Sequence, residues 1–346
     1  MIIRSFHASV IILSVFLTLP ALAKDFISIT AMGDVMMGTT FPSNLLPEND
    51  GKDLFNPAKS WIEASDIRFI NFEGTFFDGP PQPDGKSSGP NRYLFRTPSK
   101  MVSRLQEAQI NVASLANNHV KDFGTAGIIS TKKTLAQAGI QYSSKAGETA
   151  EFKVDETEIS LIAVDFYKAP RSITQPSSTY EEIRQLKNKR KLIIVSAHVG
   201  AEGQNAENIK FSDEIFLGEN RGNSVEFAHR AIDEGADVII MHGPHIPRGL
   251  ELYKNRLIIY SLGNFITGKG ISLDGNTKLA PLIRLQIDHQ GNFITGQIVS
   301  FIQQRSPQRI ELDTRHTAMR FMRDLSIKQF PNSSLLFSDD GTFKIN

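Results

Sequence analysis

The sequence predicts an α/β protein, because apolar runs of strand length alternate with helical segments over most of the chain. Several of these runs end in a polar residue that glycine follows closely. The clearest case is 242–265, where two histidines follow the buried run ADVIIM and precede a second strand, RLIIY. Functional groups of α/β folds gather at the carboxyl edges of strands, so we expect the active centre in this stretch.

The first 23 residues have the features of a secretory signal peptide. Arg4 is followed by an apolar run over 10–22, and the small residues Ala21 and Ala23 precede Lys24. We expect export to the periplasm or cell exterior after cleavage; a membrane anchor formed by an uncleaved leader is the alternative. No later segment approaches the ~20 apolar residues of a membrane span.

Composition excludes some partners and site types. The 346 residues include 38 basic and 37 acidic side chains, with a net charge of +1, so no nucleic-acid partner is expected. The chain has no cysteine, which excludes disulfides and a lipidated N-terminal cysteine. Any metal must therefore be bound through nitrogen and oxygen atoms.

In the first half of the chain, apolar or alternating runs predict the strands and breakers separate them. FISITA alternates with strand period, Asn56 and Pro57 open a helix, and Gly139 ends another. The predicted strands are 26–31, 66–71 and 110–115, and the predicted helices are 56–64, 99–108 and 125–138. The glycine- and proline-rich stretch 77–98 is either a loop that shapes substrate access or a plain surface loop.

The second half continues the alternation and then changes. The predicted strands are 158–165, 192–196, 236–241 and 256–260, and the predicted helices are 180–186 and 223–234. Beyond Pro281, the runs 282–288 and 293–301 predict a hairpin around a polar turn, and a helix is expected over 314–325. The C-terminal part should thus be a small β-hairpin and helix extension.

Polar residues suited to metal binding stand at or just after the predicted strand ends. They are Asp34, Glu73, Asn118, His119, His198, His242 and His245. An isolated histidine near a strand is usually structural, but so many at one predicted edge favour a common site. Carboxylate, amide and imidazole groups bind Mn, Fe, Zn or Mg. Two such ions about 3.5 to 4 Å apart can clamp a phosphoryl group and activate water.

The motifs GDVMMG, NFEG, ANNHVKDFG, HVGAE and HGPHIPRGLELY with YSLGNF, in this order, resemble the CapA family of capsule and poly-γ-glutamate synthesis proteins. The resemblance covers Ile27 to about Ile266. The family is similar to calcineurin-like metallophosphoesterases, which implies a four-layer α-β-β-α sandwich. The implied organisation is a signal peptide over 1–23, a metallophosphoesterase-type domain over 24–300 and an extension over 301–346 packed on that domain.

The resemblance also implies residue roles. The implied metal ligands are Asp34, Glu73 as the bridging acid, Asn118, His198, His242 and His245, for one or two divalent ions. The implied catalytic residues are His119, Asp122 and Glu202. Met36 stands where the wider superfamily has a histidine ligand, and a thioether binds hard divalent ions poorly. Gly243 stands where the first histidine of the G-H-x-H motif is expected, one residue after His242.

Two function classes follow from these residues. The first is an exported metal-dependent hydrolase that acts on a phosphoester, or on an amide of an anionic surface polymer. The second is a non-catalytic component of polymer assembly with a degenerate metal site, whose partners are the polymer and the membrane-bound synthesis machinery. Met36 favours the second and the Asn118-His119 pair favours the first. Arg248 is expected to be solvated, and Asn264 to stabilise a turn.

Overall fold

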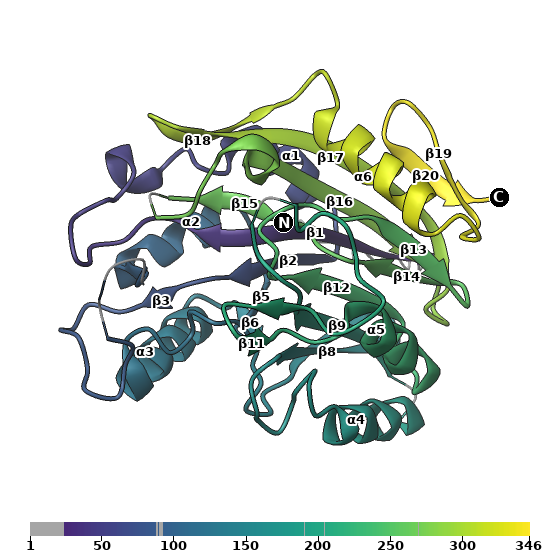
Figure 1. Cartoon of the computed structure of the whole chain (residues 1–346), viewed down its shortest axis with the longest axis horizontal. Helices are drawn as coiled ribbons and strands as arrows, with labels where there is room; N and C mark the ends of the chain where they lie inside the picture. The colour runs from purple at the N-terminus through teal and green to yellow at the C-terminus, as the bar shows by residue number, and fades with distance from the viewer. Residues whose placement is uncertain (1–23, 88, 90–92, 190, 204, 269) are drawn as a thin grey trace, which may run out of the picture.

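The chain forms a larger and a smaller mixed β-sheet with helices beside them (Figure 1). The computed structural model describes residues 24–346 except 88, 90–92, 190, 204 and 269, so the predicted leader over 1–23 lies outside the described residues. The predicted mixed α/β class is confirmed. Within the described ranges, no helix combines the length and apolarity needed to cross a bilayer.

The larger sheet is built around β1 (Ile27–Met36), in which every residue is buried. This strand pairs in parallel with β2 (Ile67–Phe72) and antiparallel with β16 (Leu279–Ile287). Its C-terminal end also pairs with β15 (Asn264–Thr267). The remaining strands of this sheet are β5 (Val112–Ser114), β6 (Gln141–Ser143), β17 (Phe293–Arg305), β18 (Gln308–Leu312), β19 (Leu335–Phe337) and β20 (Thr342–Ile345).

The smaller sheet has parallel strands at its centre and antiparallel strands at its edges. The central strands are β8 (Thr157–Asp165), β9 (Leu192–His198), β12 (Val238–His242) and β14 (Arg256–Ile259), and the edge strands are β7 (Ala150–Val154) and β13 (Leu250–Tyr253). The register pairs His242 with His198. The carboxyl ends of parallel strands therefore bring these two histidines side by side.

The two sheets share one apolar core, which contains Ile29 of β1 and Ile194 of β9. Helices cover the other faces: α1 (Lys59–Glu63), α2 (Val102–Glu107) and α3 (Gly124–Gln137) lie on the larger sheet, and α4 (Ser177–Asn188) and α5 (Ser224–Asp233) on the smaller. Helix α6 (Thr317–Gln329) contributes Met319 and Met322 to the shared core. The continuous apolar runs of the central strands are explained by burial on both faces.

The predicted C-terminal hairpin is confirmed, because β16 and β17 pair antiparallel. The structure extends β17 across residue 300 into a sheet with β18 and β20. Several strands were not predicted. Among them are β13, which lies between the histidines and β14, and also β6, β7, β15, β18, β19 and β20. Short elements complete the fold: β3 (Thr75–Phe76), β4 (Arg96–Thr97), β10 (Ile215–Phe216), β11 (Glu219–Asn220), and the 3-10 turns η1 (Glu48–Gly51), η2 (Asn56–Ala58), η3 (Ser99–Met101) and η4 (Gly275–Lys278).

Candidate metal centre

The carboxyl ends of strands from both sheets carry the candidate residues. Asp34 lies near the end of β1, and Glu73 directly follows β2. His198 and His242 are the last residues of β9 and β12. His245 follows in a loop, with a positive φ of 58°. Strand direction thus gathers side chains that lie far apart in the sequence at one edge.

A close backbone contact places Asp34 at this edge. The backbone N–H of Asp34 donates to the carbonyl of Gly263 at 2.9 Å. A Cβ at the preceding Gly33 would lie 2.0 Å from that same carbonyl oxygen, so only glycine fits. The glycine before the aspartate therefore allows the loop before β15 to pack against β1.

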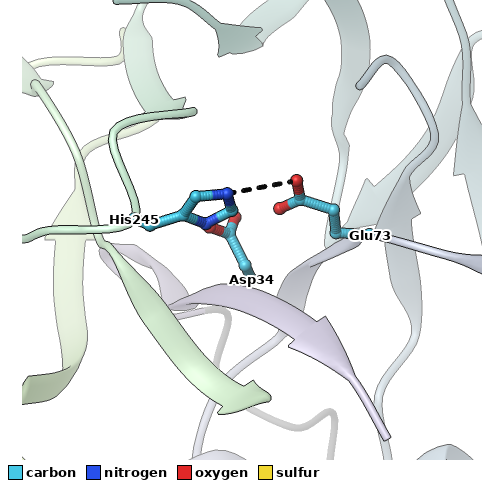
Figure 2. Close-up of side chains that lie close together, drawn as sticks. All are labelled: Asp34, Glu73 and His245. Carbon is cyan, nitrogen blue, oxygen red and sulfur yellow. Dashed lines mark hydrogen bonds and ion pairs between the residues drawn. The ribbon is translucent and has the colours of Figure 1, made fainter. Parts of the chain in front are cut away.

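Asp34, Glu73 and His245 form the centre of the site (Figure 2). The Nδ1 of His245 lies 2.9 Å from Oδ2 of Asp34, and its Nε2 lies 3.7 Å from Oε1 of Glu73. One potential ligand atom from each residue lies within 4.8 Å of the others. Both carboxylates are fully buried. The group has the composition and spacing of a divalent-metal site.

Electrostatics in this group favour a positive charge between the two acids. Burial raises the pKa of Asp34, but the hydrogen bond and charge of His245, with the charge of His242, outweigh it and lower the pKa to about 2. Burial and the Asp34 carboxylate raise the pKa of Glu73 well above its usual value. Burial lowers the pKa of His245, but Glu73 and Asp34 outweigh burial and raise it to about 10. Either an imidazolium or a divalent cation supplies this positive charge between the two carboxylates.

Several candidate ligands have buried polar atoms that form no hydrogen bond within the described residues. Within the described residues, no hydrogen bond is made by either ring nitrogen of His198 or His242, by Oδ1 of Asn118, or by Oε1 of Glu73. Burial lowers the pKa of His198 well below its ordinary value and that of His242 to about 4. Both rings are therefore neutral at neutral pH and offer lone pairs. Because such orphaned groups are costly, the donor set fits a bound metal ion.

His242 lies close to the centre as well. Its Nδ1 is 3.8 Å from Oδ1 of Asp34, and its ring stacks on Phe69 at 5.4 Å between centroids. His198 is its neighbour in register. The predicted ligands of the two sheets thus meet across Asp34.

His119 and Asp122 form a hydrogen-bonded pair beside the centre. The His119 Nδ1 lies 2.8 Å from Oδ2 of Asp122, which also accepts from the backbone N–H of Phe95 at 2.8 Å. Burial raises the pKa of Asp122, but His119 and Lys86 lower it below its ordinary value, so the carboxylate is an acceptor and Nδ1 donates. Burial lowers the pKa of His119. Its free Nε2 lies 4.0 Å from Oε1 of Glu73.

Three asparagines hold the charged residues in place through hydrogen bonds. The sequence predicted no role for two of them and only a turn-stabilising role for the third. Asn71 donates to Oδ1 of Asp34 at 2.7 Å, and Asn117 donates to Oδ1 of Asn71 at 3.1 Å. Asn264 offers Oδ1 at 3.0 Å from the His245 Nδ1, and its Nδ2 donates to the Thr277 carbonyl at 3.0 Å, so its side chain serves the site and not the turn it was expected to stabilise. Asn71 and Asn117 belong to the motifs NFEG and ANNH, but only their three-dimensional contacts distinguish them from turn residues.

The remaining predicted residues lie around the centre. Glu202 pairs with Arg221 at 2.9 Å, on the wall of a cavity. Met36 is fully buried against Phe95. The expectation for Arg248 was wrong: its guanidinium is fully buried and forms two 2.8 Å bonds to Glu214. The pairing partner supplied by a distant loop makes this burial possible.

A cavity of about 640 Å³ opens onto the site. His119, His245 and Asn118 are among its lining residues, together with aromatic and charged groups. These include Lys86, Tyr93, Phe95, Tyr167, Glu202, Phe216 and Arg221. Part of its wall comes from 77–98, the breaker-rich stretch.

Comparison with known proteins identifies one family. A profile described as "Bacterial capsule synthesis protein PGA_cap" matches residues 28–269. Similar proteins include the "Capsule biosynthesis protein CapA" of Bacillus anthracis, 24% identical over 88% of this chain and 74% of that protein. The "PGA biosynthesis protein CapA" of Bacillus subtilis is 26% identical over 72% of this chain and 65% of that protein. A "Probable polyglutamine synthesis accessory protein" of Mycobacterium tuberculosis is 29% identical over 59% and 56%.

Solved structures give weaker likenesses. A 5'-nucleotidase precursor from Thermus thermophilus aligns with a TM-score of 0.41 and 13% identity, over 87% of this chain and 58% of that one. GAP50 of Plasmodium, described as the anchor in the inner membrane complex, aligns with a TM-score of 0.35, over 87% of this chain and 95% of that one. Both likenesses are too distant to add to the description of the site.

Proposed function

The chain belongs to the family of bacterial capsule synthesis proteins, and from this membership we propose that it acts on an anionic surface polymer through a metal-dependent hydrolase-type site. Relatives are named for capsule and poly-γ-glutamate biosynthesis. The proposed substrate is such a polymer, through an amide bond, or a phosphoester. The observation that carries the proposal is the set of buried ligand atoms around Asp34, Glu73 and His245.

We further propose that the fold is the four-layer α-β-β-α sandwich of the metallophosphoesterase type. The shared core of the two sheets and the helices on their outer faces support this. In this proposal residues 24–300 form the functional domain and 301–346 an extension packed on it.

One or two divalent ions would be held by Asp34, Glu73, Asn118, His198, His242 and His245. Bound there, an ion supplies an activated water molecule and stabilises developing negative charge. The orphaned lone pairs of His198 and His242 support these assignments. Asn71 and Asn264 orient the ligands through hydrogen bonds, as residues outside the ligand set commonly do.

His119 is proposed as the proton-transfer residue. Asp122 holds the ring through Nδ1 and thereby fixes the tautomer whose unprotonated Nε2 faces Glu73 and the cavity. That nitrogen can accept a proton from an attacking group and return it to a leaving group. Glu202 acts at longer range, on the cavity wall and paired with Arg221.

The test is to measure metal content and turnover of the purified protein together. Elemental analysis should find at least one Mn, Fe, Zn or Mg ion per chain. Poly-γ-glutamate or a generic phosphodiester should be cleaved, and chelation should abolish cleavage. Absence of a bound ion after each of these metals is supplied would reject the metal centre.

A second candidate function is polymer binding without catalysis. Met36, which stands where the superfamily has a histidine ligand, favours it, and its thioether is packed against Phe95 and Ile271. In this alternative the protein serves membrane-bound polymer synthesis machinery as a binding or assembly component. Tight polymer binding with no turnover at full metal occupancy would favour this function over the hydrolase.

We also propose export after cleavage behind Ala23, with an uncleaved anchor as the alternative. The small residues at Ala21 and Ala23 support cleavage. Intact mass of the extracytoplasmic protein distinguishes the two, because an anchored form retains residues 1–23.

A further inference from the structure

A second cavity, of about 300 Å³, adjoins the one at the metal centre. Lys86, Asn118 and Tyr167 line both cavities. The second cavity is distinguished by its cations, because Lys121 and Lys145 join Lys86 on its wall. A ligand that occupied both cavities would therefore pass Asn118 and then meet three ammonium groups.

Two of these lysines are held in place by fully buried carboxylates. The Nζ of Lys145 lies 2.9 Å from Oδ2 of Asp165, and the Nζ of Lys86 lies 3.0 Å from Oδ1 of Asp122. Each ammonium has three N–H donors, so an ion pair with one carboxylate leaves donors available for a ligand. Because the side chains of Asp165 and Asp122 are 0% exposed, a ligand meets the ammonium groups and not the acids.

Further hydrogen bonds connect the loop of Lys86 to the turn beside the centre. The backbone N–H of Lys86 donates to the carbonyl of Asp122 at 3.1 Å. Asp84 accepts from the backbone N–H of Thr125 at 2.9 Å and from its hydroxyl at 2.6 Å. These bonds tie the loop that carries Lys86 to the turn that carries His119. Lys86 and His119 therefore keep one relative arrangement.

Lys121 adds a third positive charge. Its field acts on Asp84, whose pKa is lowered first by hydrogen bonds from Thr125 and also by the charge of Lys121. Lys121 is exposed, and among the residues that the structure describes it forms no ion pair. Asp84 is the acid on the same wall, and the Oδ2 of Asp84 is already bonded twice to Thr125.

Tyr167 adds a phenol whose pKa is raised to about 12 by burial and by Glu219, so it stays neutral and can donate.

We propose that this lysine cavity is an anion subsite, which binds a carboxylate or phosphate on the unit next to the one at the metal centre. Negative charge repeats along an anionic polymer, so one unit at the centre places the next charge nearby. Lysine ammonium groups suit such a ligand as compact point charges. The assignment of the neighbouring unit rests on the proposed function, whereas the binding of an anion rests on the lysines alone.

The test measures binding of tri-γ-glutamate, its tetramethyl ester, in which every carboxylate is blocked, and pyrophosphate to the full chain by calorimetry, with and without Mn²⁺. Lys121→Glu removes and reverses the charge of Lys121, and Lys133→Glu on the exposed side of α3 is the matched control. Lys145→Met is combined with Asp165→Asn so that no acid is orphaned. A further variant, Lys121→Gln, removes the charge without reversing it, and we expect it to bind the anion roughly two- to fivefold more weakly, as for loss of an exposed ion pair. The loss should be larger for Lys121→Glu. Both losses should shrink as ionic strength rises.

The outcomes separate the subsite from the catalytic proposal. Lysine-dependent binding of tri-γ-glutamate, lost in its ester, supports a carboxylate ligand, and lysine-dependent binding of pyrophosphate alone supports a phosphate ligand. Either result without turnover would reject the hydrolase and retain the subsite. Turnover with the same Kd and KM in the lysine variants as in Lys133→Glu would overturn the subsite and retain the hydrolase. Failure of both anions to bind would also overturn the subsite.

Discussion

Asp34 and His245 are 211 positions apart in the chain, yet the His245 Nδ1 lies 2.9 Å from Oδ2 of Asp34. β1 supplies the aspartate and the loop after β12 supplies the histidine, so the contact joins the two sheets. Glu73 closes the group on the other side of the imidazole. Metal binding by this group is therefore tested first.

Removal of either Asp34 or His245 should abolish tight metal binding. Asp34→Ala and His245→Ala each remove a ligand, so affinity should fall by more than the roughly 10- to 100-fold typical of residues outside the ligand set. Elemental analysis and metal titration measure this. His229→Ala is the control, because His229 pairs with Glu251 away from the centre. Equal metal binding in the variants and the control would exclude the proposed ligands.

Asp122→Asn should lower turnover and leave bound metal unchanged. The amide presents a donor as well as an acceptor, so it no longer selects the tautomer that Asp122 fixes through its 2.8 Å contact. Loss of proton transfer should cost about 10²- to 10⁴-fold in kcat. Metal stoichiometry measured on the same sample separates this effect from loss of the site. A variant with full activity would show that the pair is structural.

Met36→His should increase occupancy of the weaker of two metal positions. Imidazole binds divalent ions that a thioether binds poorly. Met36→Leu keeps the packing against Phe95 without adding a ligand, and so is the matched control. Titration with Mn²⁺ or Zn²⁺ gives the two affinities. Two equally tight ions in the unmodified protein would contradict this interpretation of Met36.

Breaking the buried pair of Arg248 and Glu214 should destabilise the protein strongly. Either Arg248→Met or Glu214→Leu strands one charge in the interior, at a cost of about 3 to 5 kcal/mol. The double variant should be markedly more stable than either single variant, because no charge is stranded. Urea unfolding measures all three. Arg309→Met, in an exposed ion pair, should change stability by less than about 1 kcal/mol.

Asp66 should make stability fall in acid. Burial raises its pKa, but hydrogen bonds from Ser28 and Lys24 outweigh burial and lower the pKa below the ordinary 3.8. The unfolded chain therefore takes up a proton first, so the contribution of Asp66 is complete above pH 3.8 and is lost as pH falls through the lower folded value. Unfolding free energy should depend less steeply on pH below 3.8 in Asp66→Asn. An unchanged slope would remove Asp66 from the acid response.

Local patterns were enough to predict the α/β class, the main strands and the edge of the sheets at which polar residues gather. Strand and helix periods are properties of adjacent residues, so runs such as ADVIIM reveal burial without knowledge of the partner. The strand ends then indicate which side chains share an edge. The short strand β13 was missed because four residues contain too little pattern to distinguish a strand from a loop.

The tertiary structure alone decided which polar groups meet and which are left without a partner. The sequence does not distinguish a solvated carboxylate, amide or guanidinium from a buried one, because the partner that allows burial comes from a distant segment. Arg248 is buried only because Glu214 meets it, and Asn71 serves the site only because β1 places Asp34 within 2.7 Å. By the same reasoning, only the tertiary structure identifies the ring nitrogens of His198 and His242 as buried atoms that make no hydrogen bond within the described part of the chain.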